Sequence, residues 1–318
     1  MDYTEYSAVK NRFSVTPTLC DLFKLLSIET WKRIEYAYLK PGVKVFETTI
    51  TQNLIFSINA YNDQYNLNID IFEALDEKTN GNDFELIIRF PADGISYYAP
   101  IQAKKIYRTG KYDSMDHGVQ IESLMDYANR NDAKPFYLLY NFTTTPINDG
   151  VTLTTPNELT GCTLVSADYL FNNHYNQRTN RNGDLAWLIP DFYDLNPNEA
   201  FPWHELVCPN NVKEFYDKLK NKGVIDKNQV FQVEELAELN NNLKQGFYPL
   251  NTFNKDQRWI NVKELTVKPK EETKNYTDEP KLFQSPRDYE SGSPSSKSST
   301  KEKVYPKFSP KSRIILNK

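Results

Sequence analysis

The chain has 318 residues, of which 39% are hydrophobic and 14% aromatic, and its formal net charge is −4. A chain of this length and composition can bury a substantial core, which excludes a wholly disordered or fibrous protein. No segment reaches the roughly 18 uninterrupted apolar residues of a membrane span. The opening MDYTEYSAVKNRF has neither the basic nor the apolar region of a signal peptide. We therefore expect a globular cytoplasmic protein that does not enter a membrane.

The charge is unevenly distributed. Residues 266–318 carry 12 Lys and Arg against 7 Asp and Glu, a balance of +5, which leaves −9 for residues 1–265. An acidic body counts against tight nonspecific binding to nucleic acid, although a local basic groove or a bound divalent metal would offset it.

The three cysteines, Cys20, Cys162 and Cys208, are widely separated and odd in number. They form neither a CxxC pair nor a zinc pattern, so we expect all three to be reduced.

Two helices are predicted near the start. Residues 18–40 carry apolar side chains at helical spacing, and Pro41-Gly42 ends the element. Residues 47–61 repeat the helical spacing with Ile50, Leu54, Ile58 and Tyr61.

The period then changes to that of strands. Residues 83–90 (DFELIIRF) and 96–107 (SYYAPIQAKKIY) alternate and are joined by Pro-Ala-Asp-Gly, a strong turn signal. Residues 119–130 resume a helical pattern, and residues 135–142 (PFYLLYNF) predict a buried strand. The order helix, hairpin, helix, strand predicts an α/β fold with a mixed sheet flanked by helices, and two further helices are expected at 211–222 and 233–245.

Four regions are expected along the chain: an N-terminal helical segment (1–40), a core (41–210), a helical extension (211–265) and a tail (266–318). The tail is rich in Lys, Glu, Ser and Pro, so we expect it to be disordered and dispensable for chemistry. Its last stretch, VYPKFSPKSRIILNK, regains apolar residues, as a docking segment for a protein partner often does. A solvated end with no partner is the alternative.

Polar residues of the hairpin converge on one face. Side chains alternate along a strand, and a turn near residues 92–95 pairs positions whose numbers sum to roughly 185 or 187. This sets Asp83 across from Gln102 or Lys104, with Cβ atoms about 4.5 to 5.5 Å apart. A carboxylate, an amide oxygen and an ammonium therefore meet, while Ile101 and Ala103 point into the core.

This set suits the hydrolysis of a phosphodiester. Mg²⁺ prefers oxygen ligands, and a nearby lysine can orient the attacking water or hold the phosphate. Glu47, at the start of the second helix, and Glu77, before the hairpin, can each add a carboxylate; Glu85 and Gln120 are accessory candidates. On spacing alone, an exposed amphipathic hairpin that carries a surface Lys–carboxylate pair is the favoured interpretation.

Other kinds of site find little support. His117, His174 and His204 show no HxxxH or HxH spacing, which argues against zinc, and we expect His204 to be structural. The chain contains neither GxxxxGK[ST] nor GxGxxG, so no phosphate-binding loop is predicted.

The run GNDFELIIRF followed by APIQAKKIY resembles the PD-(D/E)xK nuclease superfamily in its D…QxK form, seen in Mrr-like restriction endonucleases. Over roughly residues 40–210, the chain is similar to a bacterial family of unknown function with a predicted nuclease fold, the DUF6615 type. The similarity lies in a set of short blocks, of which QAKK and YLLYN are the most specific: Glu47-Thr48 and Thr51, Gly81-Asn82-Asp83, Gln102 to Lys105, Tyr112, Gln120, Tyr137 to Asn141, Gly161-Cys162, and Pro202-Trp203-His204.

The resemblance implies a restriction-endonuclease-like fold and a role for each matching residue. Asp83 would be the metal-bridging carboxylate, Gln102 a contact of the metal or its water, Lys104 the water-orienting cation, and Glu47 a helix carboxylate near the metal. Gln102 stands where the acidic form of the motif has Glu. This removes one negative charge, so we expect a modest metal affinity that depends on Glu47 or Glu77.

The sequence thus predicts a Mg²⁺-dependent endonuclease, with Mn²⁺ able to substitute, acting on DNA in restriction or antiphage defence. RNA stays open as a substrate. So does a homodimer, since such nucleases often need two sites to cut a duplex. The alternative is a noncatalytic protein-interaction module on the same fold.

Overall fold

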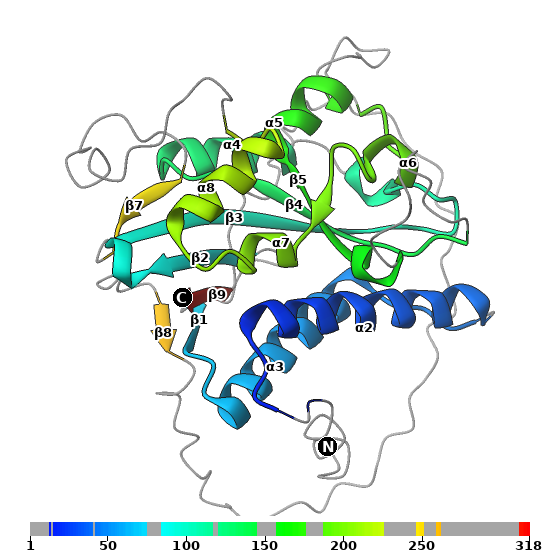
Figure 1. Ribbon diagram of the computed structural model, residues 1–318. Coiled ribbons are helices and arrows are strands. Elements are labelled where there is room, and N and C mark those ends of the chain that lie inside the picture. Colours follow the sequence, from blue (N-terminus) through cyan, green and yellow to red (C-terminus); the bar gives the residue numbers. More distant parts are fainter. Residues whose placement is uncertain are drawn as a thin grey trace, which may run out of the picture.

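The computed structural model describes residues 13, 15–40, 42–74, 84–116, 120–144, 157–175, 187–225, 246–250, 259–261 and 312–318 (Figure 1). Glu77, Asp83, His117, the helix expected at 233–245 and most of the predicted tail lie outside these residues.

Four of the five predicted helices, those at 18–40, 47–61, 119–130 and 211–222, are present with small shifts of their ends. Thr18 begins the first of them, because its hydroxyl accepts from the backbone N–H of Asp21 while the Asp21 carboxylate accepts from the N–H of Thr18. The helices are α2 (Leu19–Leu39), α3 (Glu47–Tyr65), α4 (Gln120–Arg130), α5 (Ala167–Leu170), α6 (Phe192–Leu195), α7 (His204–Val207) and α8 (Val212–Asn221). None of the helices within the described ranges is both long and apolar enough to cross a membrane.

The described strands form one mixed sheet, which confirms the predicted fold class. Its order is β6-β5-β4-β3-β2-β9-β1-β8, and β7 pairs with β3. The strand β3 is antiparallel to β2 and parallel to β4. The strands are β1 (Ile69–Ala74), β2 (Phe84–Phe90), β3 (Ile95–Lys105), β4 (Phe136–Tyr140), β5 (Cys162–Ser166), β6 (Phe201–Pro202), β7 (Phe247–Pro249), β8 (Trp259–Asn261) and β9 (Ser312–Asn317).

The hairpin register agrees with its prediction from the turn. Phe84 pairs with Ile101 and Phe90 with Ile95, so paired positions sum to 185. The turn between them is a short 3₁₀ segment that closes at Gly94, whose φ of 67° lies in the left-handed region that glycine adopts without strain.

The prediction of a disordered tail is wrong for its last residues. Ser312–Asn317 forms β9, which lies inside the sheet between β2 and β1 (Figure 1). It runs parallel to β2 and antiparallel to β1, and Ile314, Ile315 and Leu316 are buried. The apolar residues that suggested a docking segment therefore dock on the chain's own sheet, because strand pairing satisfies their backbone and burial covers their side chains.

Helices cover both faces of the hairpin. On one face, Phe84, Leu86 and Ile88 belong to the main core, together with buried residues of α2, α3 and α8. The ring of Tyr97 lies 4.8 Å from that of Phe215 on α8. On the other face, a smaller cluster joins Ile87, Tyr98 and Ile315 to Ala128 of α4. Side chains alternate between the two faces of a strand, so Ile87 and Tyr98 point toward α4.

The prediction that all cysteines are reduced is wrong for two of them. Cys20, in the first turn of α2, forms a disulfide with Cys208, 188 residues later. The two meet because α2 packs on α7, where the indole Nε1 of Trp203 donates to the carbonyl of Phe23 at 2.8 Å. Cys162 is free and buried, and burial raises the pKa of its thiol to about 12.

Candidate functional site

Two polar side chains occupy the end of β3 on the face toward α4. Gln102 is 4% exposed and Lys104 is 3% exposed, whereas Ile101 and Ala103 point into the main core. The face that carries the QxK pattern is therefore buried, which contradicts the alternative of an exposed amphipathic hairpin. A nearly buried ammonium and amide are costly unless partners or a ligand satisfy them.

The ammonium of Lys104 has one partner in the described part of the chain. Its Nζ donates to Oε1 of Gln120 at 2.8 Å. Gln120 is the first residue of α4, so this helix places an amide against the end of β3. An ammonium has three donors, and the other two have no partner among the described residues. They are free to donate to further acceptors.

The side chain of Gln102 has fewer hydrogen-bond partners than that of Lys104. Its amide makes no hydrogen bond to any described residue, although the side chain is almost fully buried. The amide lies on the same face of β3 as Lys104, and its atoms are not among the fully buried polar atoms without a partner, so they keep some access to solvent.

Glu47 lies at the start of α3 and reaches the end of β3. Its Oε2 accepts from the backbone N–H of Lys105 at 2.8 Å and from the hydroxyl of Ser114 at 3.2 Å. The N–H of Ile106 donates to Tyr140 on β4. Because successive N–H groups of a strand point to opposite sides, the N–H of Lys105 points toward the β2 side, and Glu47 lies there. The N-terminus of a 19-residue helix also favours a carboxylate.

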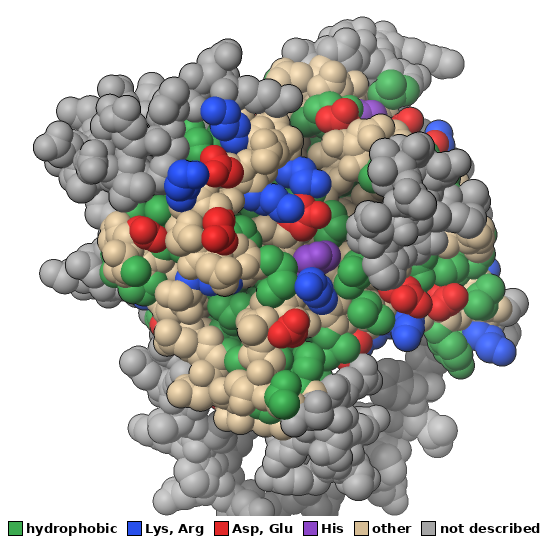
Figure 2. All heavy atoms as spheres, in the orientation of Figure 1, with side chains coloured by type: hydrophobic (Ala, Val, Ile, Leu, Met, Phe, Trp, Pro, Cys, Tyr) green, Lys and Arg blue, Asp and Glu red, His purple; other side chains and the backbone are tan. Residues whose placement is uncertain are grey.

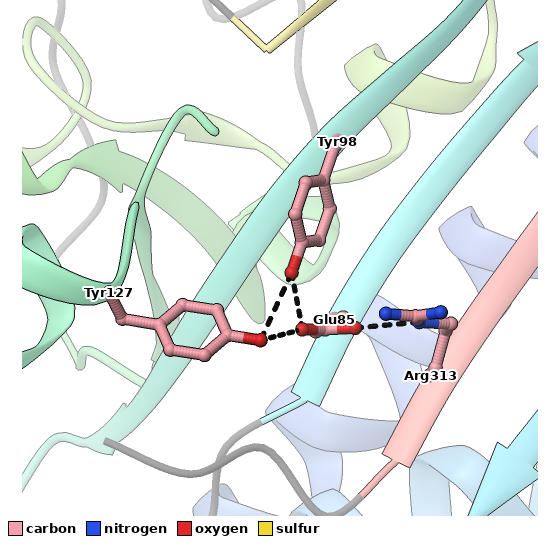
Figure 3. A network of polar contacts seen from close by, with 4 residues as sticks. All are labelled: Glu85, Tyr98, Tyr127 and Arg313. Carbon is pink, nitrogen blue, oxygen red and sulfur yellow. Dashed lines mark hydrogen bonds and ion pairs between the residues drawn. The ribbon is translucent and has the colours of Figure 1, made fainter. Parts of the chain in front are cut away.

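Glu85 has a different role from the accessory one predicted for it. It is fully buried, and its Oε1 accepts from the hydroxyls of Tyr98 and Tyr127 (Figure 3). Its Oε2 pairs with Nε of Arg313 on β9 at 2.7 Å. Both oxygens are thus occupied by side chains from β3, α4 and β9, so Glu85 joins these elements as a structural carboxylate.

Asp83 and Glu77 lie outside the described residues. Among the described residues, no three His, Cys, Asp or Glu lie together as a metal would require. The oxygen atoms that described side chains bring to the end of β3 include those of the Gln102 and Gln120 amides and of the Glu47 carboxylate.

Several residues of the blocks that carried the resemblance have structural contacts. The hydroxyls of Thr51 and Tyr140 lie 2.8 Å apart, joining α3 to β4. Tyr112 donates to Asn141 at 2.6 Å inside the core. A side chain at Gly161 would meet the carbonyl oxygen of Ser27 at 2.0 Å, so only glycine allows α2 to approach this closely.

His204 is buried at the start of α7, as expected for a structural residue. Burial lowers its pKa to about 4, while the neighbouring Glu205 opposes the shift. The folded pKa lies below the unfolded value of about 6.5. Between pH 4 and pH 6.5, the imidazole of His204 therefore binds a proton more readily in the unfolded chain than in the folded protein.

We therefore expect the stability that neutral His204 contributes to be complete above pH 6.5 and to be lost as the pH falls toward 4, by on the order of 3 kcal/mol. Urea unfolding of the wild type and His204→Gln between pH 4 and 7 measures it. An equal pH slope in both proteins would contradict this assignment.

A cavity of about 590 Å³ adjoins Glu47, and no sequence pattern predicted it. The end of α2, residues 42–46 and residues 105–109 enclose it. Its members are far apart in the sequence, and they meet because the end of α2 contacts residues 105–109, where Arg108 donates to the carbonyl of Ala37. The sequence therefore did not distinguish Tyr38 and Tyr107, which line the cavity, from the other tyrosines of the chain.

Fold and site together define a mixed α/β protein whose central strand presents a lysine and an amide on a buried face. A family model described as "Family of unknown function (DUF6615)" matches residues 19–285, and the chain belongs to this family. The match extends beyond residues 40–210 on both sides. No curated protein and no solved structure shows a significant match.

Proposed function

We propose that this protein is a metal-dependent nuclease of the PD-(D/E)xK type that hydrolyses phosphodiester bonds of nucleic acid, with DNA as the expected substrate. The observation that carries the proposal is the buried pair of Lys104 and Gln102 at the end of β3. Lys104 keeps two donors without a described partner, and the Gln102 amide has none. A nearly buried ammonium and amide that keep hydrogen-bonding capacity on one face provide a polar site that a ligand would satisfy.

The available donors fit a magnesium ion in type. Asp83 directly precedes β2, and with the Gln102 amide and the Glu47 carboxylate it would provide an all-oxygen set, which Mg²⁺ prefers. When bound, the ion would lower the pKa of a water and stabilise charge on the scissile phosphate. The set contains two carboxylates, so the affinity is expected to be modest.

The chain's own residues would position the reaction. Lys104 would hold the attacking water or a phosphate oxygen through its two remaining donors, while Gln120 fixes the direction of its Nζ. Ser114 and the N–H of Lys105 hold Glu47 at the β2 side of β3. Burial of this face excludes bulk water, which strengthens each electrostatic contact.

The surface charges support local rather than extensive contact with nucleic acid. On the face shown in Figure 2, basic and acidic side chains are interspersed over α7 and α8, where Lys218 and Lys222 pair with Glu205. The described residues of this face form no continuous basic surface for a phosphate backbone. Binding would then depend on the site and its immediate surroundings.

The test is incubation of the purified protein with plasmid DNA and with RNA, in Mg²⁺, in Mn²⁺ and in EDTA. We expect cleavage with either metal and none in EDTA, because no described group replaces the metal in activating water. Undiminished cleavage in EDTA would overturn the mechanism. Absence of cleavage under all conditions would favour a noncatalytic interaction module on the same fold.

A further inference from the structure

The cavity beside Glu47 is large enough for a ligand of its own. Its volume of about 590 Å³ lies within the range of pockets that bind small molecules. Glu47 and Lys105 line it, and the same Glu47 accepts from the N–H of Lys105 at the end of β3. A ligand in the cavity would therefore lie beside Glu47, whereas Gln102 and Lys104 do not line the cavity.

The walls of this cavity are aromatic and open to solvent. Tyr38, Phe46 and Tyr107 are 39%, 62% and 42% exposed. Figure 2 shows hydrophobic side chains among charged ones where the far end of α2 reaches the surface. Aromatic rings that line a cavity and remain accessible provide a platform on which a flat ring can stack.

Cations accompany these rings. The Nζ of Lys105 lies 4.2 Å from the centre of the Tyr107 ring, and the guanidinium of Arg108 lies 6.0 Å from that of Tyr38. Arg108 also donates to the carbonyl of Ala37 at 2.8 Å, which ties residues 105–109 to the end of α2. Lys44 lines the cavity as well. The walls thus combine stacking surfaces with three cations, Lys44, Lys105 and Arg108, against two carboxylates, Glu47 and Asp113.

We propose that this cavity binds an unpaired nucleobase of a nucleic-acid strand and that its lysines and arginine contact the adjoining phosphates, so that the protein selects single-stranded or locally unpaired substrates. The inference rests on the proposed nuclease function and specifies its substrate. A flat ring joined to an anionic backbone matches both features of the walls. A fully paired duplex offers no free base to enter the cavity, so it would bind more weakly.

Binding is measured in EDTA, which keeps the substrate intact, with a fluorescent single strand and a blunt duplex of the same sequence. We expect the single strand to bind at least about tenfold more tightly. Tyr38→Ala and Tyr107→Ala should each weaken single-strand binding by about 5-fold to 100-fold, the effect of losing one base–aromatic stack. Tyr36→Ala is the matched control, since Tyr36 is an exposed tyrosine of the same helix outside the cavity and should change nothing.

An abasic oligonucleotide of about eight nucleotides separates the contribution of base stacking to binding from that of the phosphate contacts. It should bind the wild type as weakly as the normal strand binds Tyr107→Ala. Equal binding of the base-free and normal strands would overturn the inference, as would a free mononucleotide that binds as tightly as the strand. If the wild type cleaves with Mg²⁺ but the two tyrosine variants bind single strands normally, this inference fails and the nuclease stands. Base-dependent binding without cleavage would reject the nuclease alone.

Discussion

Replacing Lys104 by methionine is expected to reduce Mg²⁺-dependent cleavage by at least about 100-fold while the protein stays folded. A donor aimed at charge that develops in a transition state typically contributes a factor of this size or more. Methionine keeps an apolar stem of similar length in the buried position, and it removes an ammonium that is only 3% exposed. Initial cleavage rates and urea unfolding of the same preparation measure the two effects.

The matched control is Lys111→Met, because Lys111 is exposed and lies outside the end of β3. It should retain full activity. Asp83→Ala should match the loss in Lys104→Met if Asp83 holds the metal. Gln102→Glu restores the acidic form of the motif, so we expect activity to persist with an equal or higher metal affinity. Wild-type rates in both Lys104→Met and Asp83→Ala would reject the proposed site.

Removing residues 312–318 should prevent the protein from folding. The deletion takes away a strand from inside the sheet together with Ile314, Ile315 and Leu316, whose burial contributes about 1.5 to 3 kcal/mol each. It also leaves Glu85 without its arginine. Together these losses are comparable to the roughly 5 to 15 kcal/mol that stabilise a typical domain. Circular dichroism and the yield of soluble protein measure the outcome.

An internal deletion tests whether the loss is specific to β9. Asn261 pairs with Phe72 on one side of β1, and Ser312 pairs with Glu73 on the other side. The chain that joins residues 261 and 312 must therefore span only two strand spacings, about 10 Å. Deleting residues 271–300 leaves ample length, and this variant should fold and cleave normally. A folded protein without residues 312–318 would show that β9 is dispensable.

Single substitutions divide the contribution of β9 further. Arg313→Met should cost about 3 to 5 kcal/mol, because it leaves a fully buried carboxylate without its cation. Adding Glu85→Gln should recover most of this loss, since an amide oxygen can still accept from Tyr98 and Tyr127.

The sequence predicted those helices and strands that depend on residues close together in the chain. The β2–β3 register followed from alternation and a four-residue turn, and Gln102 and Lys104 share a face because they are two residues apart. The position of β9 depends instead on partners more than two hundred residues away. The sequence pattern of such a short apolar run does not distinguish a strand inside the sheet from an exposed segment that binds a partner protein.

The same distinction explains the other corrections. Glu85 was a reasonable ligand by its face, yet its role depends on Arg313 and Tyr127, which strand spacing does not reveal. Cys20 and Cys208 are adjacent only because α2 packs on α7. The Lys104–Gln120 contact was within reach of the sequence, because the start of the next helix lies close to the strand that precedes it.

The place of β9 in the sheet also affects how the protein is made. During synthesis, β1 and β2 leave the ribosome more than two hundred residues before the strand that separates them. Until then, their facing edges carry unpaired backbone groups beside apolar side chains, a combination that attracts other strands. A neighbouring nascent chain can supply the missing strand as well as the chain itself can. The rate of synthesis and the local concentration of chains should therefore govern how much protein closes on itself and how much exchanges β9 with another copy.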